Sequence, residues 1–306
     1  MDHRGRILIT GGSGLIGRAL TPELTTRGYE VVILSRRPEK VRGLPAGARA
    51  VGWDATTAAG WSEELSGALG IIHLAGANLA HWPWTAERKR VIRESRVGSG
   101  QAVLAAIQRV RERPAFLLQS SGVGYYGDRG DEPMREEDGP GRGFLAELCV
   151  DWEASTAAVE DLGVRRVVLR SGVVLSTEGG ALPPIARPFK LFVGGPLGTG
   201  RQYISWIHIA DEVRAIRFLA EHSEARGPFN LAAPEPVTNR EMSREIAAAL
   251  RRPNLLRAPA FALHLTLGEM SQALLEGRRV LPAALLALGF EFRFPRLPQA
   301  LADLYA

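Results

Sequence analysis

The sequence predicts an α/β protein in which a doubly wound parallel sheet carries a smaller C-terminal lobe. Two observations support this prediction: a glycine-rich turn stands near the N-terminus, and short apolar runs alternate with helical stretches over about the first 230 residues. This alternation is the β-α-β pattern of a parallel sheet. A chain of 306 residues, of which 45% are hydrophobic, is long enough to build both the sheet and the second lobe.

Seven apolar runs are expected to form the strands of the sheet. They are residues 7–9, 31–34, 50–51, 71–74, 116–118, 167–169 and 229–231. We expect residues 1–174 to form the sheet domain, completed by about 204–232, and residues 175–203 and 233–306 to form the second lobe. Asp211 is expected to cap the helix that returns the chain to the sheet.

The last part of the chain is predicted to be packed rather than free. Apolar side chains recur at helical spacing at Leu263, Leu267, Met270, Leu274 and Leu275. A stripe of this kind is stable only when it is buried against another element. We therefore expect this segment to form part of the wall of a cleft between the second lobe and the sheet domain.

Residues 10–17 read Thr-Gly-Gly-Ser-Gly-Leu-Ile-Gly and stand between the first apolar run and an amphipathic helix. Gly11 permits a tight turn, Gly14 lets the backbone approach a pyrophosphate, and Gly17 lets the helix pack closely on the sheet. The free N–H groups at the start of the helix favour an anion. This pattern predicts a Rossmann-type dinucleotide site. The residues expected to hold the phosphates are Gly11, Ser13, Gly14, Leu15, Ile16 and Gly17.

The end of the second apolar run indicates which dinucleotide is bound. An enzyme that uses NAD usually places Asp or Glu here, whereas this sequence reads Ser35-Arg36-Arg37 and has no acid. A guanidinium group bonds a phosphate through two N–H groups, so the sequence favours NADP(H) over NAD. The alternative is that Arg36 and Arg37 are solvated loop charges.

Two further segments complete the predicted cofactor site. Asp54 follows the third run and is a candidate to contact the edge of the adenine ring. Leu74, Ala75 and Gly76 stand at the end of the fourth run, where the backbone must approach the nicotinamide ribose closely.

Composition argues against several other classes of protein. The net charge of +5 comes from 38 Lys and Arg against 33 Asp and Glu, so we expect an anionic small molecule and no nucleic acid as partner. No apolar run approaches the about 20 residues of a membrane helix, so no membrane partner is expected.

No His, Cys, Asp and Glu cluster has metal-ligand spacing, so no metal is expected. Cys149 is the single cysteine and no leader-like segment opens the chain, which favours the cytoplasm and leaves the oligomeric state open.

Several motifs together resemble the extended short-chain dehydrogenase/reductase family. They are the Thr-Gly-x-x-Gly-x-x-Gly turn, the Leu-Ala-Gly at 74–76 and the Ser-Ser-Gly-Val-Gly-Tyr-Tyr-Gly-Asp at 120–128. Other segments resemble its atypical "epimerase family" branch, which is NAD-dependent epimerase/dehydratase-like: 84–85 with Lys89, 95–96, 170–175, 194–196, 200–211 and the tail at 268–290. The resemblance covers essentially the whole chain, including the small C-terminal domain of that branch.

The resemblance implies a reaction in which a Tyr exchanges a proton with the substrate and a Lys four residues later holds the nicotinamide ribose. If Glu153 aligns with the acid that often follows this pair, the Tyr position is Leu145 and the Lys position is Cys149. Leucine carries no exchangeable proton, and the cysteine is interpreted as a small buried residue. The sequence therefore departs from the family at its catalytic pair.

The remaining catalytic candidates lie on the fifth apolar run and the turn after it. Ser121 stands where the family's Ser or Thr binds a substrate oxygen, with Ser120 as the alternative and a local capping role as the competing interpretation. Tyr125 and Tyr126 are the nearest phenols that could replace the missing acid/base group, and we rank them equally. One of them is expected to pack against the helix instead. Asp128 is a candidate to orient the reacting hydroxyl.

Lys190 and Arg201 are the charges that the resemblance places nearest the cleft, where each suits a phosphate or carboxylate and is otherwise a surface cation. We expect an NADP-dependent oxidoreductase or epimerase that acts on an anionic small molecule by hydride transfer. The alternative is a non-catalytic NADPH-binding regulatory or scaffold protein, which the missing Tyr-Lys pair favours.

Overall fold

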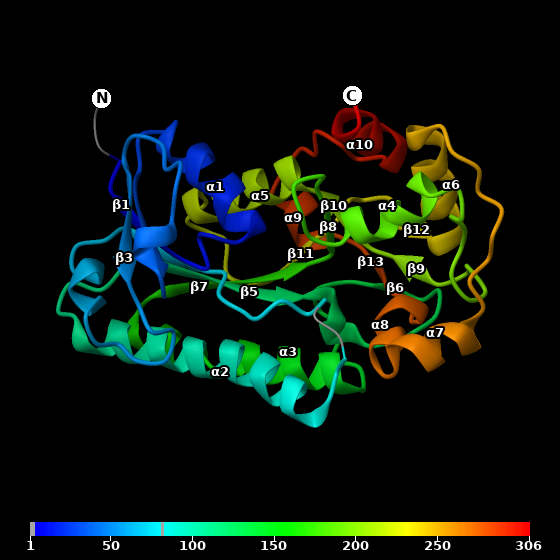
Figure 1. Cartoon of the computed structure of the whole chain (residues 1–306). Coiled ribbons are helices and arrows are strands. Elements are labelled where there is room, and N and C mark those ends of the chain that lie inside the picture. The colour runs from blue at the N-terminus through cyan, green and yellow to red at the C-terminus, as the bar shows by residue number, and fades with distance from the viewer. Residues whose placement is uncertain (1–3, 81–82) are drawn as a thin grey trace.

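A seven-stranded parallel sheet forms the centre of the protein, as the sequence predicts (Figure 1). The computed structural model describes residues 4–80 and 83–306. The strand order is β11-β7-β5-β4-β1-β2-β3, so the order reverses at β1 and leaves a crevice at the carboxyl ends of its neighbours. The strands are β1 (Arg6–Thr10), β2 (Glu30–Ser35), β3 (Ala48–Gly52), β4 (Gly70–His73), β5 (Phe116–Gly122), β7 (Arg165–Ser171) and β11 (Gly227–Leu231).

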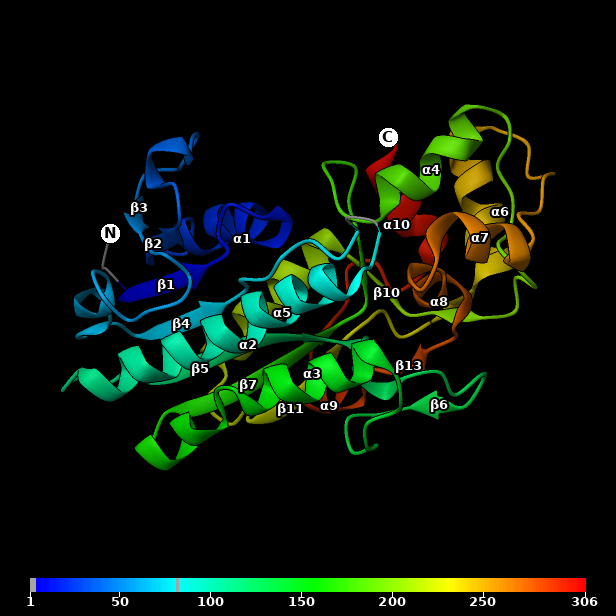
Figure 2. The same cartoon turned by 60° about the horizontal axis from the view of Figure 1, so that its bottom comes forward.

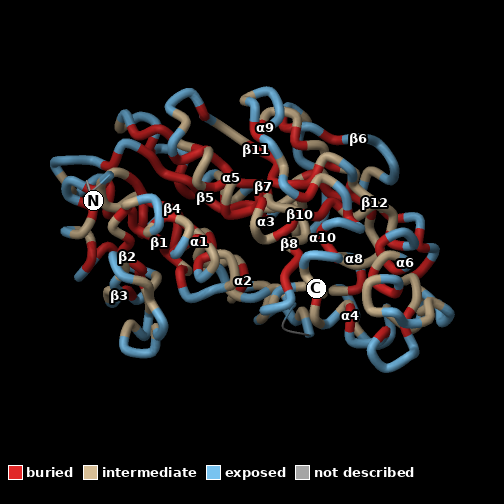
Figure 3. The backbone as a smooth tube through the Cα atoms, turned by 90° about the horizontal axis from the view of Figure 1, so that it is seen from above, coloured by how far each residue is buried: buried red, intermediate tan, exposed pale blue. Residues whose placement is uncertain are grey.

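Helices cover both faces of the sheet, because both faces of each central strand are apolar. On β1, Ile7 and Ile9 face α1 (Leu15–Thr25) and α5 (Ile209–Glu221), whereas Leu8 belongs to the core on the opposite face. That face is covered by α2 (Ala86–Arg109) and α3 (Phe144–Ala154), which lie side by side in Figure 2. Figure 3 shows buried segments along the strands between these layers.

The second lobe has a core of its own, built mainly from helices. Short strand pairs lie within and beside it, and Trp206 and Phe189 are fully or nearly fully buried inside it. Its helices are α4 (Leu182–Lys190), α6 (Asn239–Leu250), α7 (Ala260–Leu267), α8 (Met270–Leu275) and α10 (Leu297–Leu304). The pairs are β8 (Val173–Leu175) with β10 (Trp206–His208), β9 (Tyr203–Ile204) with β12 (Val237–Thr238), and β6 (Pro133–Met134) with β13 (Arg279–Val280).

None of the helices in the described residues is both long and apolar enough to cross a membrane. Four short 3-10 turns connect the larger elements of the described chain. They are η1 (Pro38–Lys40), η2 (Ser62–Leu65), η3 (Val123–Tyr126) and η4 (Ala157–Leu162).

The C-terminal segment does not stay in the second lobe, in contrast to the expected division of the chain. Helix α9 (Ala283–Ala287) lies against β11, and Leu285 and Phe290 are buried in the core of the sheet domain. The expected apolar stripe at 263–275 is only half-buried. On α7, Phe261 and Leu265 are 74% and 86% exposed. The segment is therefore anchored by its last 25 or so residues rather than by that stripe.

Helix α5 begins at Ile209, two residues before the predicted start, so Asp211 lies in its first turn and is not its cap. The ring of His208 accepts the Ala210 N–H at 3.0 Å and caps the helix. The Asp211 carboxylate instead accepts the backbone N–H groups of Arg293 and Phe294 at 2.9 and 2.8 Å. This buried acid fixes the C-terminal segment to the sheet domain.

The anchoring role of α9 predicts unequal effects at two neighbouring leucines. Leu285→Ala removes a fully buried side chain from the core of the sheet domain and should lower the free energy of unfolding by about 2–5 kcal/mol. Leu286, which is 47% exposed, is the matched control, and Leu286→Ala should cost less than about 0.5 kcal/mol. Urea unfolding measures both, and equal losses would contradict the packing described here.

Candidate functional site

A cavity of about 740 Å³ follows the carboxyl ends of β1, β2, β3 and β4, and we call it the sheet-edge cavity. It brings together most of the residues that the sequence assigns to a cofactor. The predicted residues among its lining are Gly11, Ser13, Gly14, Ser35, Arg36, Arg37, Asp54, Leu74, Ala75 and Gly76. Leu15, Ile16 and Gly17 form the first turn of α1 and do not line it. Lining residues that sequence reasoning missed include Lys40, Trp53, Val91, Glu94 and Ser95.

The glycine turn has the geometry of an anion site. Gly11 has a φ of +67°, and a Cβ there would lie 2.7 Å from the Leu74 carbonyl oxygen. A Cβ at Gly17 would lie 2.4 Å from the Cα of Gly12, so only glycine lets α1 pack this closely. Helix α1 begins at Leu15, and its N-cap residue Gly14 provides no side-chain cap; its first turn has no acid. Its first N–H groups are therefore available to a negatively charged ligand.

Three cations gather where β2 ends. The side chains of Arg36, Arg37 and Lys40 are exposed and line the sheet-edge cavity. None of them is paired with a carboxylate among the described residues. Ser35 shapes this end, since its hydroxyl accepts the Arg37 N–H at 3.2 Å. The cluster suits a dianionic group such as a phosphate.

Asp54 lines the sheet-edge cavity and is also bonded within its own turn. Its Oδ1 accepts the N–H groups of Thr56 and Thr57, and its Oδ2 accepts the Thr57 hydroxyl, each at 2.8 Å. Although partial burial favours the neutral acid, these hydrogen bonds lower the pKa of Asp54 to about 2. The charged carboxylate thus closes the turn after β3 and lines the sheet-edge cavity, where the sequence predicts its contact with adenine.

Thr10 and His73 form a buried pair that fixes the backbone directly after β4. The Thr10 hydroxyl accepts the Ala75 N–H at 3.1 Å and lies 2.7 Å from Nδ1 of His73. Burial lowers the pKa of His73 to about 4, so its ring is neutral near pH 7. The strand ends of β1 and β4 are thereby tied together directly beside the backbone of Gly76.

Ser121 at the end of β5 belongs to a buried polar cluster. Its hydroxyl donates to Oε1 of Glu153 at 2.6 Å, and the two carboxylate oxygens of Glu153 accept Nε and Nη2 of Arg170 at 3.0 Å each. Burial opposes the charge of Arg170, but the hydrogen bonds with Glu153 outweigh it and raise the pKa of the guanidinium. This bidentate ion pair orients Ser121.

The two neighbouring tyrosines have different surroundings. Tyr126 is fully buried, donates to Asn230 at 2.8 Å and accepts from Arg170 at 3.0 Å. Burial raises its pKa to about 12. Tyr125 is half-buried with its ring 3.5 Å from the guanidinium carbon of Arg170, and its hydroxyl bonds to none of the described residues. Only Tyr125 therefore has a hydroxyl left over for a ligand.

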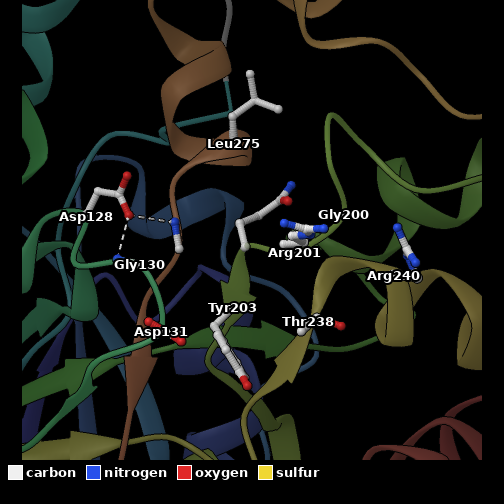
Figure 4. A pocket seen from close by; sticks show the side chains of 11 residues that line it. Asp128, Gly130, Asp131, Gly200, Arg201, Tyr203, Thr238, Arg240 and Leu275 are labelled. Carbon is white, nitrogen blue, oxygen red and sulfur yellow. Dashed lines mark hydrogen bonds between the residues drawn. The ribbon is translucent and has the colours of Figure 1, made fainter.

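A second cavity of about 560 Å³ lies between the two lobes, and we call it the interlobe cavity. It contains Arg201, as expected, and Arg240 (Figure 4). Its lining is Asp128, Gly130, Asp131, Gly200, Arg201, Gln202, Tyr203, Thr238, Arg240, Leu275 and Gly277. Asp128 does not orient a tyrosine, because its Oδ1 accepts the N–H groups of Gly130 and Gly277 at 3.1 Å each and joins the lobes.

Residues 7–232 match the NAD dependent epimerase/dehydratase family. The chain belongs to this family. Residues 258–304 match a domain of unknown function, DUF1731. The resemblance and the fold inferred from the motifs are thus confirmed.

Relatives of similar length share the whole chain. The epimerase family protein Mb2239 of Mycobacterium bovis is 38% identical over 296 residues, 96% of each chain, and YfhF of Bacillus subtilis is 37% identical over 301 residues, 98% of each chain. The structure of the human epimerase family protein SDR39U1 (isoform 2) with NADPH has a TM-score of 0.88 at 32% identity, over 98% of this chain and 99% of that one. A nucleoside-diphosphate sugar epimerase from Corynebacterium glutamicum has a TM-score of 0.79 at 34% identity, over 98% of this chain and 58% of that one.

Leu145 and Cys149 occupy the positions where the epimerase/dehydratase resemblance places Tyr and Lys. Leu145 is half-buried beside Gly124, where a Cβ on the glycine would lie 3.3 Å from its own. The Cys149 thiol donates to the Gly122 carbonyl at 3.7 Å. Burial, aided by the charge of Glu153, raises the pKa of Cys149 to about 11, so it is a neutral thiol near pH 7. Neither side chain replaces the acid/base pair.

Lys190 lies away from both cavities of this epimerase family member. It is exposed at the end of α4, and its ammonium group is 6.0 Å from the centre of the Tyr305 ring. The expectation that Lys190 faces the cleft therefore differs from its position in the structure.

The Ser121 cluster predicts a large loss of stability when its acid is neutralised. Glu153→Gln leaves the buried Arg170 without a counter-charge and should lower the free energy of unfolding by about 3–5 kcal/mol. Glu147 on the same helix is exposed, and Glu147→Gln is the matched control with an expected change below about 0.5 kcal/mol. Denaturant titration compares the two, and a Glu153→Gln protein as stable as the control would refute the structural role of the pair.

Proposed function

We propose that this member of the epimerase/dehydratase family binds NADP(H) in the sheet-edge cavity and acts as an oxidoreductase or epimerase on an anionic small molecule. The observation that carries the proposal is the cluster of Arg36, Arg37 and Lys40 at the end of β2, without a carboxylate partner among the described residues. A carboxylate at this place selects NAD, whereas guanidinium groups suit the 2′-phosphate of NADP(H). The NADPH in the human relative supports this choice.

The lining of the sheet-edge cavity fits such a cofactor from end to end. The first N–H groups of α1 and the glycine turn hold the pyrophosphate, and Arg36 and Arg37 hold the 2′-phosphate. The backbone at 74–76 lies at the opposite end, beside the nicotinamide ribose. When bound, NADP(H) supplies a hydride donor or acceptor.

Ser121 and Tyr125 are the side chains that we assign to the reacting oxygen of the substrate. Ser121 donates its proton to Glu153 in this structure, and the same hydroxyl turned toward the substrate would donate to the reacting oxygen and leave the proton exchange to Tyr125. Tyr125 is the phenol with an uncommitted hydroxyl, and it exchanges the proton. Tyr126 maintains the fold around them through Arg170 and Asn230.

The anionic part of the substrate is assigned to the interlobe cavity. Arg201 and Arg240 line it from the second lobe, where their guanidinium groups suit a phosphate or carboxylate. Asp128 is already engaged by two backbone N–H groups and does not neutralise them by an ion pair. The nucleoside-diphosphate sugar named for the Corynebacterium relative is a substrate of this anionic class.

The cofactor assignment predicts a preference that depends on Arg36. NADPH should bind more tightly than NADH, and Arg36→Ala should weaken NADPH by about ten- to a hundredfold with little effect on NADH. Arg42, exposed and outside the cavity lining, provides the control Arg42→Ala, which should change neither affinity. Calorimetric titration measures these affinities. Equal affinities for NADPH and NADH in the natural protein would contradict the assignment.

The catalytic assignment predicts that the tyrosines behave differently. Tyr125→Phe should reduce turnover by about 10²–10⁴-fold and leave NADPH affinity within a few fold, because the ring is kept and only the hydroxyl is lost. Tyr126→Phe should mainly lower stability, since it removes two buried hydrogen bonds. Ser121→Ala should also reduce turnover.

The assay screens NADPH oxidation against carbonyl compounds, sugar nucleotides and keto acids, and then tests the variants on any substrate found. Activity that survives both Tyr125→Phe and Ser121→Ala would eliminate this mechanism. NADPH binding without turnover of any compound would instead favour a cofactor-binding regulatory protein.

A further inference from the structure

Arg96 is a buried cation that the roles described so far leave unused. It lies on α2, is 7% exposed and forms no salt bridge with any carboxylate of the described residues. Its Nη1 donates to the Ile92 carbonyl at 3.2 Å and reaches Ser95 Oγ at 3.5 Å. Its Nε and Nη2 donate to none of the described residues. A largely buried guanidinium with two donor groups that no described residue accepts suits a ligand that brings acceptor oxygens.

The position of this guanidinium connects it with the sheet-edge cavity. A Cβ built on Gly76 would lie 3.0 Å from its central carbon, so the absence of a side chain at Gly76 is what makes room for Arg96. Gly76 and Ser95 both line the cavity, and Ser95 Oγ accepts the Ala77 N–H at 3.0 Å. The charge is therefore fixed against the backbone that follows β4.

The strand order shows which end of the cavity this is. The cations at 36, 37 and 40 follow β2, the glycine turn follows β1, and Gly76 follows β4 on the other side of β1. A dinucleotide with its 2′-phosphate beside β2 and its pyrophosphate on the glycine turn has its nicotinamide half beside β4. Arg96 thus stands at the nicotinamide end.

Packing fixes the guanidinium in place, and the group remains charged despite its burial. Its central carbon lies 5.0 Å from the centre of the Trp152 ring of α3, a cation–π contact that partly offsets burial. Desolvation lowers the pKa of Arg96 to about 10, which still leaves it protonated near pH 7. Cys149, at the family's Lys position, lies close enough to interact electrostatically with it.

We propose that the guanidinium of Arg96 binds the ribose hydroxyls at the nicotinamide end of NADP(H). Arg96 would thus supply from α2 the positive charge that the Lys of the short-chain dehydrogenase/reductase family supplies from the position of α3. The Cys149 side chain is too short and too apolar for that task, and Arg96 lies within electrostatic range of it. This inference rests on the proposed function, because it requires NADP(H) in the sheet-edge cavity.

Two ligands separate the ends of the cavity in the test. NADPH carries the nicotinamide ribose, whereas adenosine 2′,5′-bisphosphate has the 2′-phosphate end alone. Arg96→Met should weaken NADPH about tenfold and change the affinity for the bisphosphate by less than about twofold. Arg36→Ala should weaken both ligands. Arg93→Met is the matched control on α2, since Arg93 pairs with Asp151 on α3, and it should alter neither affinity.

Arg96→Lys keeps the charge without the fork of donors, and NADPH affinity should fall by only about threefold. This variant also serves where Arg96→Met does not fold. Unchanged NADPH affinity in both Arg96 variants, or an equal loss for NADPH and the bisphosphate, would overturn the inference and make Arg96 a packing residue. A natural protein that binds neither ligand would instead refute the proposed function itself.

Discussion

The buried ion pair of Glu153 and Arg170 is the interaction on which the arrangement of the catalytic candidates depends. It joins α3 to β7, and its members also bond Ser121 on β5 and Tyr126 in η3. Tyr126 in turn bonds Asn230 on β11. A buried pair offers little net stability over an apolar one, but breaking it leaves an uncompensated charge. Its main effect is to fix the positions of β5, β7 and β11 relative to α3.

The sheet determines what the other end of the site can bind. Because the strand order reverses at β1, one crevice receives the ends of β2 and β4 from opposite sides. At the glycine turn the crevice presents backbone N–H groups, because α1 begins there without a side-chain cap and a Cβ on Gly11 would clash with the Leu74 carbonyl. Arg36 is exposed in the lining at the β2 end, and Arg96 lies buried beside Gly76 at the β4 end. This distribution matches a dinucleotide with a phosphate at one end and a ribose at the other.

Much of the fold could be predicted because its signals are local. Most strands have a continuous apolar run, and the spacing of Gly11 and Gly17 alone indicates that a side chain at either position would clash. Arg36 and Arg37 were predictable since they directly follow a strand, so their place at the sheet edge requires no knowledge of tertiary packing.

The remaining features depend on contacts between distant segments. Tyr125 and Tyr126 are adjacent in sequence, and only the positions of Arg170 and Asn230 distinguish them. The turn that occupies Asp54, the contact of Lys190 with Tyr305 and the return of Leu285 to the sheet leave no periodic signal. Arg96 belongs to the segment 95–96 that resembles the epimerase family branch. Its burial was not predictable, because it follows from the packing of α2 on α3.

A crystal structure of the complex with NADPH tests the central claim most directly, because the claim concerns both ends of one bound molecule. The account predicts the 2′-phosphate in contact with Arg36, the pyrophosphate on the first N–H groups of α1 and the nicotinamide ribose hydrogen-bonded to Arg96. NADPH bound in the reverse direction, or with an Arg96 guanidinium that bonds only to protein groups, would contradict it.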